Sequence, residues 1–142
     1  MLLKNPLSCI LLWLILIVMM ILHFNYNVGK IFYGIDVTRA EAEGIVPIST
    51  HFIRNIYYHL PVIWILILMS TTLTWIKLAL FLISIVYTLS HAGHLVGEVI
   101  SDPDLSQAPL LSLTLVVSIV LSIEHFRYWR AAKEGVTTID NR

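Results

Sequence analysis

The chain has 142 residues, of which 58% are hydrophobic and only 13% are charged, and its mean hydropathy is +0.84. A soluble domain of this length carries roughly a quarter charged residues, so the composition excludes an ordinary water-soluble fold. The formal net charge is zero, which provides no basic field for binding nucleic acid. The length predicts one integral membrane domain over residues 1–142.

The first apolar run predicts a membrane helix over about residues 6–24. Between Leu7 and Leu22 it holds a single hydroxyl residue, Ser8. A secretory signal peptide would end in small residues at a cleavage site, whereas His23-Phe24-Asn25 follows here. We therefore expect this helix to remain in place. The only cysteine lies within this run, so an intrachain disulfide is excluded.

The second span carries polar residues in its first part. The apolar run over residues 60–73 is too short to cross about 30 Å of hydrocarbon, so the predicted span, 52–73, extends back over Arg54, Asn55 and His59. Pro61 falls inside this helix and is expected to bend it, because it removes a backbone donor and crowds the preceding turn.

The remaining spans are predicted over about residues 76–97 and 109–127. The break over residues 72–75 predicts a tight turn between the second and third spans. A moderately polar segment of about 20 residues, 28–49, separates the first two spans and predicts one sizeable outer loop. The expected fold is an all-α, four-transmembrane-helix bundle in the lipid bilayer.

The basic residues sort unevenly between the two sides. Six of the nine lie on the side of the termini and three on the other: Lys4, Lys77, Arg127, Arg130, Lys133 and Arg142 against Lys30, Arg39 and Arg54. The richer side is normally cytoplasmic. The pattern predicts a multi-pass protein of the cell (inner) membrane, with its N- and C-termini in the cytoplasm.

Three histidines are expected at one depth. His59 and His91 each lie sixteen residues from Trp75 in the turn, on its two sides, which places both about 25 Å from the inner boundary. We expect their imidazoles within about 10 Å of each other, the spacing of packed helices. His23 reaches nearly the same level from the first span, and His94 lies one turn further out.

The third span gathers its polar residues on one face, which is therefore expected to face the bundle: Ser84, Tyr87, His91, His94 and Glu98. Gly93 and Gly97 would let a neighbouring helix approach closely. On the fourth span, His125 lies toward the inner end, away from the other histidines.

Five residues make up the candidate site, which is predicted to bind a metal near the outer face: His23, His59, His91, His94 and Glu98. Histidine and glutamate on adjacent helices suit a transition metal such as zinc, copper or iron. Two histidines at equal depth also suit haem ligation, and imidazole suits proton or quinone chemistry with a small polar ligand. The competing interpretation is that these side chains join helices by hydrogen bonds and hold no ligand.

The sequence is compatible with two function classes. The chain is either a binding or redox protein that uses the histidine-rich site, or a non-catalytic accessory or assembly subunit. The second class implies association with another membrane protein or with a second copy of the chain. No motif identifies a reaction, so the sequence does not decide whether the chain is an enzyme.

Reporter fusions test the predicted orientation. Because six of nine basic residues lie on the side of the termini, a reporter at the C-terminus is expected to be cytoplasmic and one within residues 28–49 external. Alkaline phosphatase, which works outside the cytoplasm, should be active when fused within residues 28–49 and inactive at the C-terminus. A fluorescent protein that requires the cytoplasm should show the reverse. An external C-terminus would contradict the orientation.

Overall fold

A computed structural model of the chain describes residues 6–38, 44–101 and 105–140. Every regular element among them is helical. Within these residues, four helical stretches are long and apolar enough to cross a membrane: Leu7–Tyr33, Ile48–Ser70, Thr74–Ser101 and Ala108–Gly135. The shortest has 23 residues and covers about 35 Å at the rise of an α-helix, which exceeds the ~30 Å hydrocarbon core. The predicted all-α fold with four membrane spans is confirmed.

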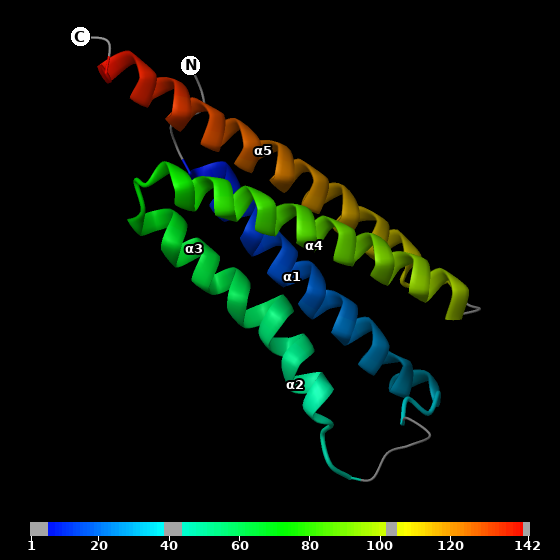
Figure 1. Ribbon diagram of the computed structural model, residues 1–142. Helices are drawn as coiled ribbons and strands as arrows, with labels where there is room; N and C mark the ends of the chain where they lie inside the picture. The colour runs from blue at the N-terminus through cyan, green and yellow to red at the C-terminus, as the bar shows by residue number, and fades with distance from the viewer. Residues whose placement is uncertain (1–5, 39–43, 102–104, 141–142) are drawn as a thin grey trace.

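The elements follow in chain order: α1 (Leu7–Gly29), the 3₁₀ turn η1 (Lys30–Tyr33), α2 (Ile48–Arg54), the π-helical turn η2 (Asn55–His59), α3 (Leu60–Ser70), α4 (Thr74–Ser101) and α5 (Ala108–Asp140). Together α2, η2 and α3 form the second span. The start of α1 and the end of α5 lie at one end of the bundle, here called the termini end (Figure 1). The opposite end is called the loop end.

The loop between the first two spans is shorter than predicted. It covers residues 34–47, about 14 residues rather than about 20. The first span continues as helix through η1, and α2 begins already at Ile48. Gly34 ends η1 with a φ of 74°, a left-handed conformation that costs glycine little because it has no Cβ.

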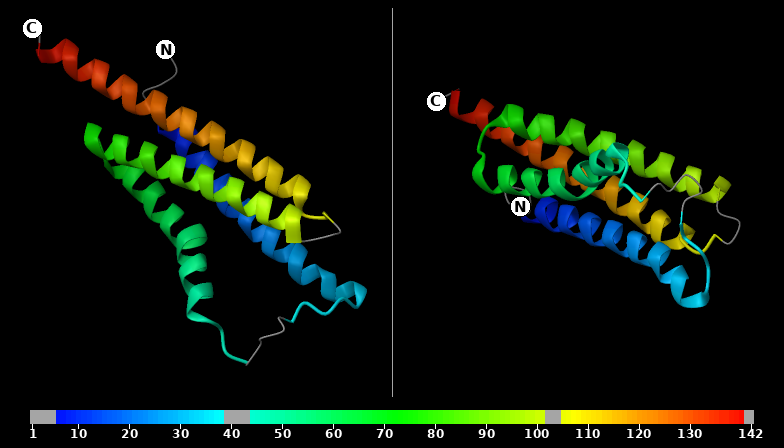
Figure 2. Two further views of the ribbon diagram at one scale, coloured as in Figure 1. Left: turned by 45° about the vertical axis from the view of Figure 1, so that its right-hand side comes forward. Right: turned by 90° about the horizontal axis from the view of Figure 1, so that it is seen from below.

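The second span bends where Pro61 was expected to bend it. The π-helical turn η2 directly precedes Pro61, and Leu60 N–H donates to the Asn55 carbonyl five residues back. In this register the next carbonyl, that of Ile56, would need a donor from residue 61, and proline has no N–H. Beyond η2, toward the loop end, α2 stands away from α4 (Figure 2).

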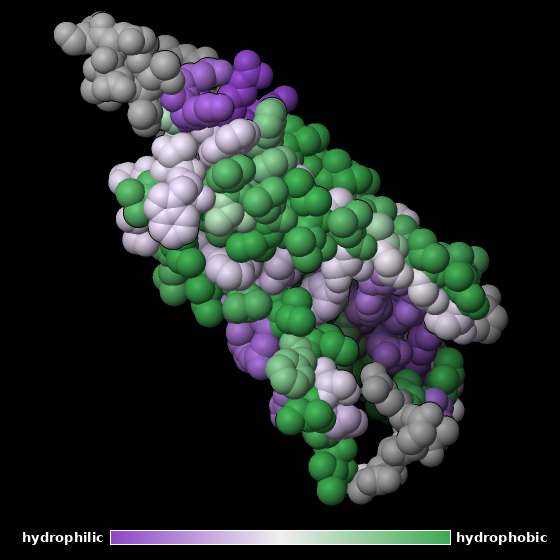
Figure 3. All heavy atoms as spheres, in the orientation of Figure 1, coloured by the Kyte–Doolittle hydropathy of each residue, from purple (hydrophilic) through white to green (hydrophobic). Residues whose placement is uncertain are grey.

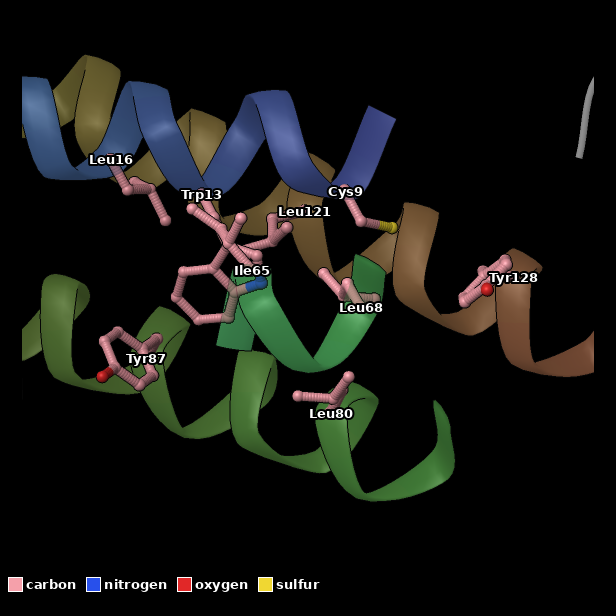
Figure 4. Packing of buried hydrophobic residues seen from close by; sticks show 9 residues of the cluster. All are labelled: Cys9, Trp13, Leu16, Ile65, Leu68, Leu80, Tyr87, Leu121 and Tyr128. Carbon is pink, nitrogen blue, oxygen red and sulfur yellow. The ribbon is translucent and has the colours of Figure 1, made fainter. Parts of the chain in front are cut away.

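All four spans contribute to the buried core. Its central residue is Trp13, which is fully buried and packs edge-to-face on Tyr87 with ring centroids 4.9 Å apart. The buried cluster comprises Cys9, Trp13, Leu16, Ile65, Leu68, Leu80, Tyr87, Leu121 and Tyr128 (Figure 4). Edge-to-face aromatic pairs and dense packing stabilise helix association in lipid, where the hydrophobic effect between helices is absent.

A buried hydrogen bond joins the first and last spans. Trp13 Nε1 donates to His125 Nε2 over 3.0 Å, and both side chains are 0% exposed. Indole N–H is a donor only, so this bond requires the His125 tautomer that carries its proton on Nδ1. The sequence placed His125 apart from the other histidines, but it did not indicate this bond with Trp13.

The outward surface of α4 is apolar and open. Gly93 and Gly97 lie on this helix, and a Cβ added at either would meet nothing within 4 Å. The expectation that these glycines admit a neighbouring helix is therefore wrong for the described helices of this chain. The outward surface is otherwise formed by large apolar side chains, as suits contact with lipid: Leu82, Val86, Leu89, Val96 and Ile100.

A double-mutant cycle tests the bond between Trp13 and His125. Trp13→Phe or His125→Leu leaves the other partner's polar atom buried without a partner, so each is expected to lower the free energy of unfolding by about 1–3 kcal/mol. The double variant should be more stable than the sum predicts, with a coupling of about 0.6–1.7 kcal/mol. Unfolding in SDS measures these values, with the exposed Trp75→Phe as control. Strictly additive effects would contradict the bond.

Candidate functional site

A pocket of about 640 Å³ lies at the loop end between α1 and α2, with residues 37 and 45–47 of the loop over it. α4 contributes His94 to its wall. It exists because α2 diverges from the bundle beyond the π-helical turn. Figure 3 shows hydrophilic side chains gathered in a recess at this end, bordered by apolar surface. The polar side chains that line the pocket are His23, Asn27, Thr50, Arg54, Tyr57, Tyr58 and His94.

Two of the predicted site residues are bonded to each other. His23 Nε2 and His94 Nε2 lie 3.1 Å apart, and the two rings meet edge-to-face with centroids 4.8 Å apart. His23 comes from α1 and His94 from α4, which are far apart in sequence. When both rings are neutral, one Nε2 donates the hydrogen bond and the other accepts it. The Nδ1 of the donating ring is then an acceptor, and the Nδ1 of the accepting ring is a donor.

The rest of the pair's surroundings come from α4 and α5. The side chain of Gln107, which is 1% exposed and directly precedes α5, reaches the His23 ring. His23 Nδ1 and Gln107 Oε1 are both buried, and neither has a hydrogen-bond partner among the described residues. Glu98 lies close enough to interact electrostatically with His23. These contacts bring three of the five predicted site residues, His23, His94 and Glu98, into one region.

His91 lies deeper in the bundle than His94. It is 2% exposed, and its ring lies beside the rings of Tyr57 and Tyr87, at centroid distances of 5.4 and 6.4 Å. Its Nδ1 is buried and has no partner within the described parts of the chain. The polar face of α4 therefore turns inward at Ser84, Tyr87 and His91, as expected, while His94 and Glu98 are only partly buried.

Tyrosine hydroxyl groups hold the π-helical turn in place. The Tyr87 hydroxyl donates to the Ile56 carbonyl over 2.5 Å, which supplies the donor that Pro61 lacks. The hydroxyls of Tyr57 and Ser90 bond to each other, and that of Tyr58 donates to the Met20 carbonyl over 3.2 Å. The turn is thereby tied to α4 on one side and to α1 on the other.

His59 does not join the other predicted site residues. It is exposed, and its Nδ1 bonds to Asn55 Oδ1, one turn back, over 2.6 Å. It borders a smaller groove of about 270 Å³ on the outside of the bundle, together with Ile21 and Phe24 of α1. Its role in the predicted metal site has no support from this position.

Metal coordination by the predicted set lacks a convergent geometry. Within the described residues, no group of three or more histidine, cysteine, aspartate or glutamate side chains is arranged to hold a metal ion.

The loop beside the site is itself ordered by an acidic residue. Thr38 N–H donates to Asp36 Oδ1 over 2.8 Å, and the hydrogen bonds from the Thr38 side chain and backbone hold the pKa of Asp36 below its usual value.

Three polar residues of the site escaped prediction from sequence: Gln107, Tyr57 and Tyr58. Gln107 stands directly before an apolar helix, where a polar residue ordinarily needs no special explanation. The two tyrosines precede Pro61, and this was the available signal. A proline that follows a polar stretch of a membrane helix leaves a backbone carbonyl without its N–H donor, and a nearby side chain must supply one.

Comparison of the chain with protein-family models, with curated proteins and with solved structures finds no match.

Chemical modification tests the arrangement of the histidines. With diethyl pyrocarbonate, His51 and His59 should react readily because they are exposed, and His94 more slowly because its Nε2 is bonded to His23. His91 and His125 should remain unmodified until SDS unfolds the protein. Peptide mass spectrometry gives the rate at each site. Reaction of His91 as fast as that of His51 would contradict the burial described.

Proposed function

We propose that this multi-pass membrane protein binds a small polar ligand in the pocket under residues 37 and 45–47, with His23 and His94 as its main polar contacts. The observation that carries the proposal is the direct bond between these two histidines, from different helices, at the wall of an open pocket. Ionisable residues within membrane spans are costly, and they commonly mark ligand or proton pathways.

The histidine pair suits a ligand that both donates and accepts hydrogen bonds. The Gln107 amide beside His23 carries an oxygen acceptor and an NH₂ donor, so it can complement either tautomer of His23. If His23 changes tautomer, the roles of the His94 nitrogens reverse. A hydroxyl, amine or carbonyl group in the pocket therefore finds a matching partner at His94.

Metal and haem fit this arrangement less well. A structural zinc takes four protein ligands and a catalytic zinc commonly three, and the described residues offer no such group. Axial ligation of haem needs imidazoles on opposite faces of the porphyrin. His23 and His94 are in hydrogen-bond contact, which leaves no room for a porphyrin between them. An organic ligand is accordingly favoured over both.

The alternative function, an accessory or assembly subunit, uses a different surface. The outward surface of α4 is apolar, and the space at Gly93 and Gly97 is open, which suits close packing of a helix from another chain. Lipid covers such a surface equally well. The histidine pocket would then serve only to hold α1 and α4 together.

Mass measurement of the purified protein tests the proposed function. Native mass spectrometry of wild-type protein released from nanodiscs is expected to show a retained non-covalent adduct, with no metal by elemental analysis and no haem absorption band. His23→Ala and His94→Ala should lose the adduct because both partners shape the pocket wall.

The matched control is His51→Ala, which removes an exposed histidine of α2 that does not line the pocket and should keep the adduct. Wild-type protein without any adduct, or an adduct kept equally by His94→Ala, would contradict the proposal and favour the accessory subunit. Stoichiometric metal or haem lost in the same variants would contradict the organic ligand.

A further inference from the structure

Arg54 lies where two cavities meet. It lines the loop-end pocket and also the smaller groove on the outside of the bundle, and both cavities share Phe24 and Tyr58 as well. The Tyr58 side chain lies within electrostatic range of Arg54. The pocket therefore adjoins, at Arg54, a groove between α1 and the second span on the outside of the bundle.

We infer that the ligand of this site is an anionic phospholipid, with its phosphate at Arg54 and an acyl chain in the groove between α1 and the second span. This inference rests on the proposed function: the polar group bound in the pocket is then the head group of that lipid.

The charges of the two cavities support an anionic head group. Arg54 is the one lysine or arginine among the described residues that line them, and no aspartate or glutamate does so. A guanidinium group forms paired hydrogen bonds with phosphate oxygens. Thr50 and His94 line the same pocket and provide further hydrogen-bonding groups for a phosphate or glycerol oxygen.

The depth of Arg54 matches the position of lipid phosphates. The second span begins at Ile48, so Arg54 lies about 9 Å along the helix from that end. The polar region of each leaflet occupies roughly the outer 5–8 Å of the bilayer, and an arginine side chain reaches several ångströms toward it. Arg54 can therefore meet a phosphate without leaving its helix.

The groove distinguishes a lipid from free phosphate. Ile21 and Phe24 of α1 line it and are 45% and 52% exposed, while Tyr58 and His59 close its other side. Apolar side chains at this place offer nothing to a soluble anion, whereas they match an acyl chain. A lipid can also enter sideways from its own leaflet, because the groove opens toward the membrane.

Native mass spectrometry with defined lipids tests the inference. The full-length protein is placed in nanodiscs of phosphatidylcholine with a minor share of phosphatidylglycerol, and the lipid retained after release is measured. Wild-type protein should retain phosphatidylglycerol preferentially. Arg54→Gln should reduce this retention about tenfold, because a charge-assisted phosphate contact is lost, while Arg54→Lys should retain part of it.

The matched control is Lys30→Gln, which removes another basic residue at the loop end. Equal losses in both variants would show general attraction to the anionic surface and overturn the inference. Ile21→Trp fills the groove without changing charge and should also lower retention. SDS unfolding midpoints equal to wild type show that these substitutions leave the fold intact.

Inorganic phosphate serves as the second probe. Displacement of phosphatidylglycerol by inorganic phosphate would identify a soluble anion site and overturn the inference. So would binding of phosphate together with unchanged phosphatidylglycerol retention in Ile21→Trp. An adduct lost in His94→Ala but unchanged in Arg54→Gln would overturn the inference and leave the proposed function standing. Loss of preference for phosphatidylglycerol in Arg54→Gln alone, with Lys30→Gln unchanged, supports it.

Discussion

A hydrogen bond that proline cannot make determines much of this structure. Pro61 lies inside the second span, and in the π-helical register before it the Ile56 carbonyl lacks a backbone donor. Within a bilayer no water is available to supply one. The Tyr87 hydroxyl does so from α4, and this contact anchors the middle of the second span while its loop-end part diverges.

The pocket is a consequence of that divergence. If the second span were straight and continuously α-helical, α2 would follow α4, and the space lined by His23, His94 and Arg54 would be filled by helix packing. The bonds of Tyr57 to Ser90 and of Tyr58 to Met20 keep the two neighbouring helices attached at the turn. The opening therefore begins at η2 and extends toward the loop end.

Polar groups in this bundle fall into two sets with different surroundings. Toward the termini end, Trp13 and His125 form a closed, fully buried pair within the apolar core, which suits a structural role. Toward the loop end, the bonded pair of His23 and His94 borders an open pocket. A histidine pair that only joined helices would not need the adjacent opening, and this difference supports assigning ligand binding to the loop-end pair alone.

The sequence determined the four spans, the bend at Pro61 and the inward face of α4. Apolar length, proline chemistry and helical periodicity are local properties, and they suffice for these features. Only the tertiary structure decided that His23 pairs with His94, whereas the sequence had placed His23 level with His59 and His91. It also decided that His59 borders the outer groove, that Gln107 lies beside His23 and that Trp13 bonds to His125. Periodicity gives the depth of a side chain and the face it occupies, but not which helix lies opposite. The π-helical turn adds a further rotation to every residue before it, so the direction of His59 and Arg54 depends on a backbone adjustment that tertiary contacts stabilise.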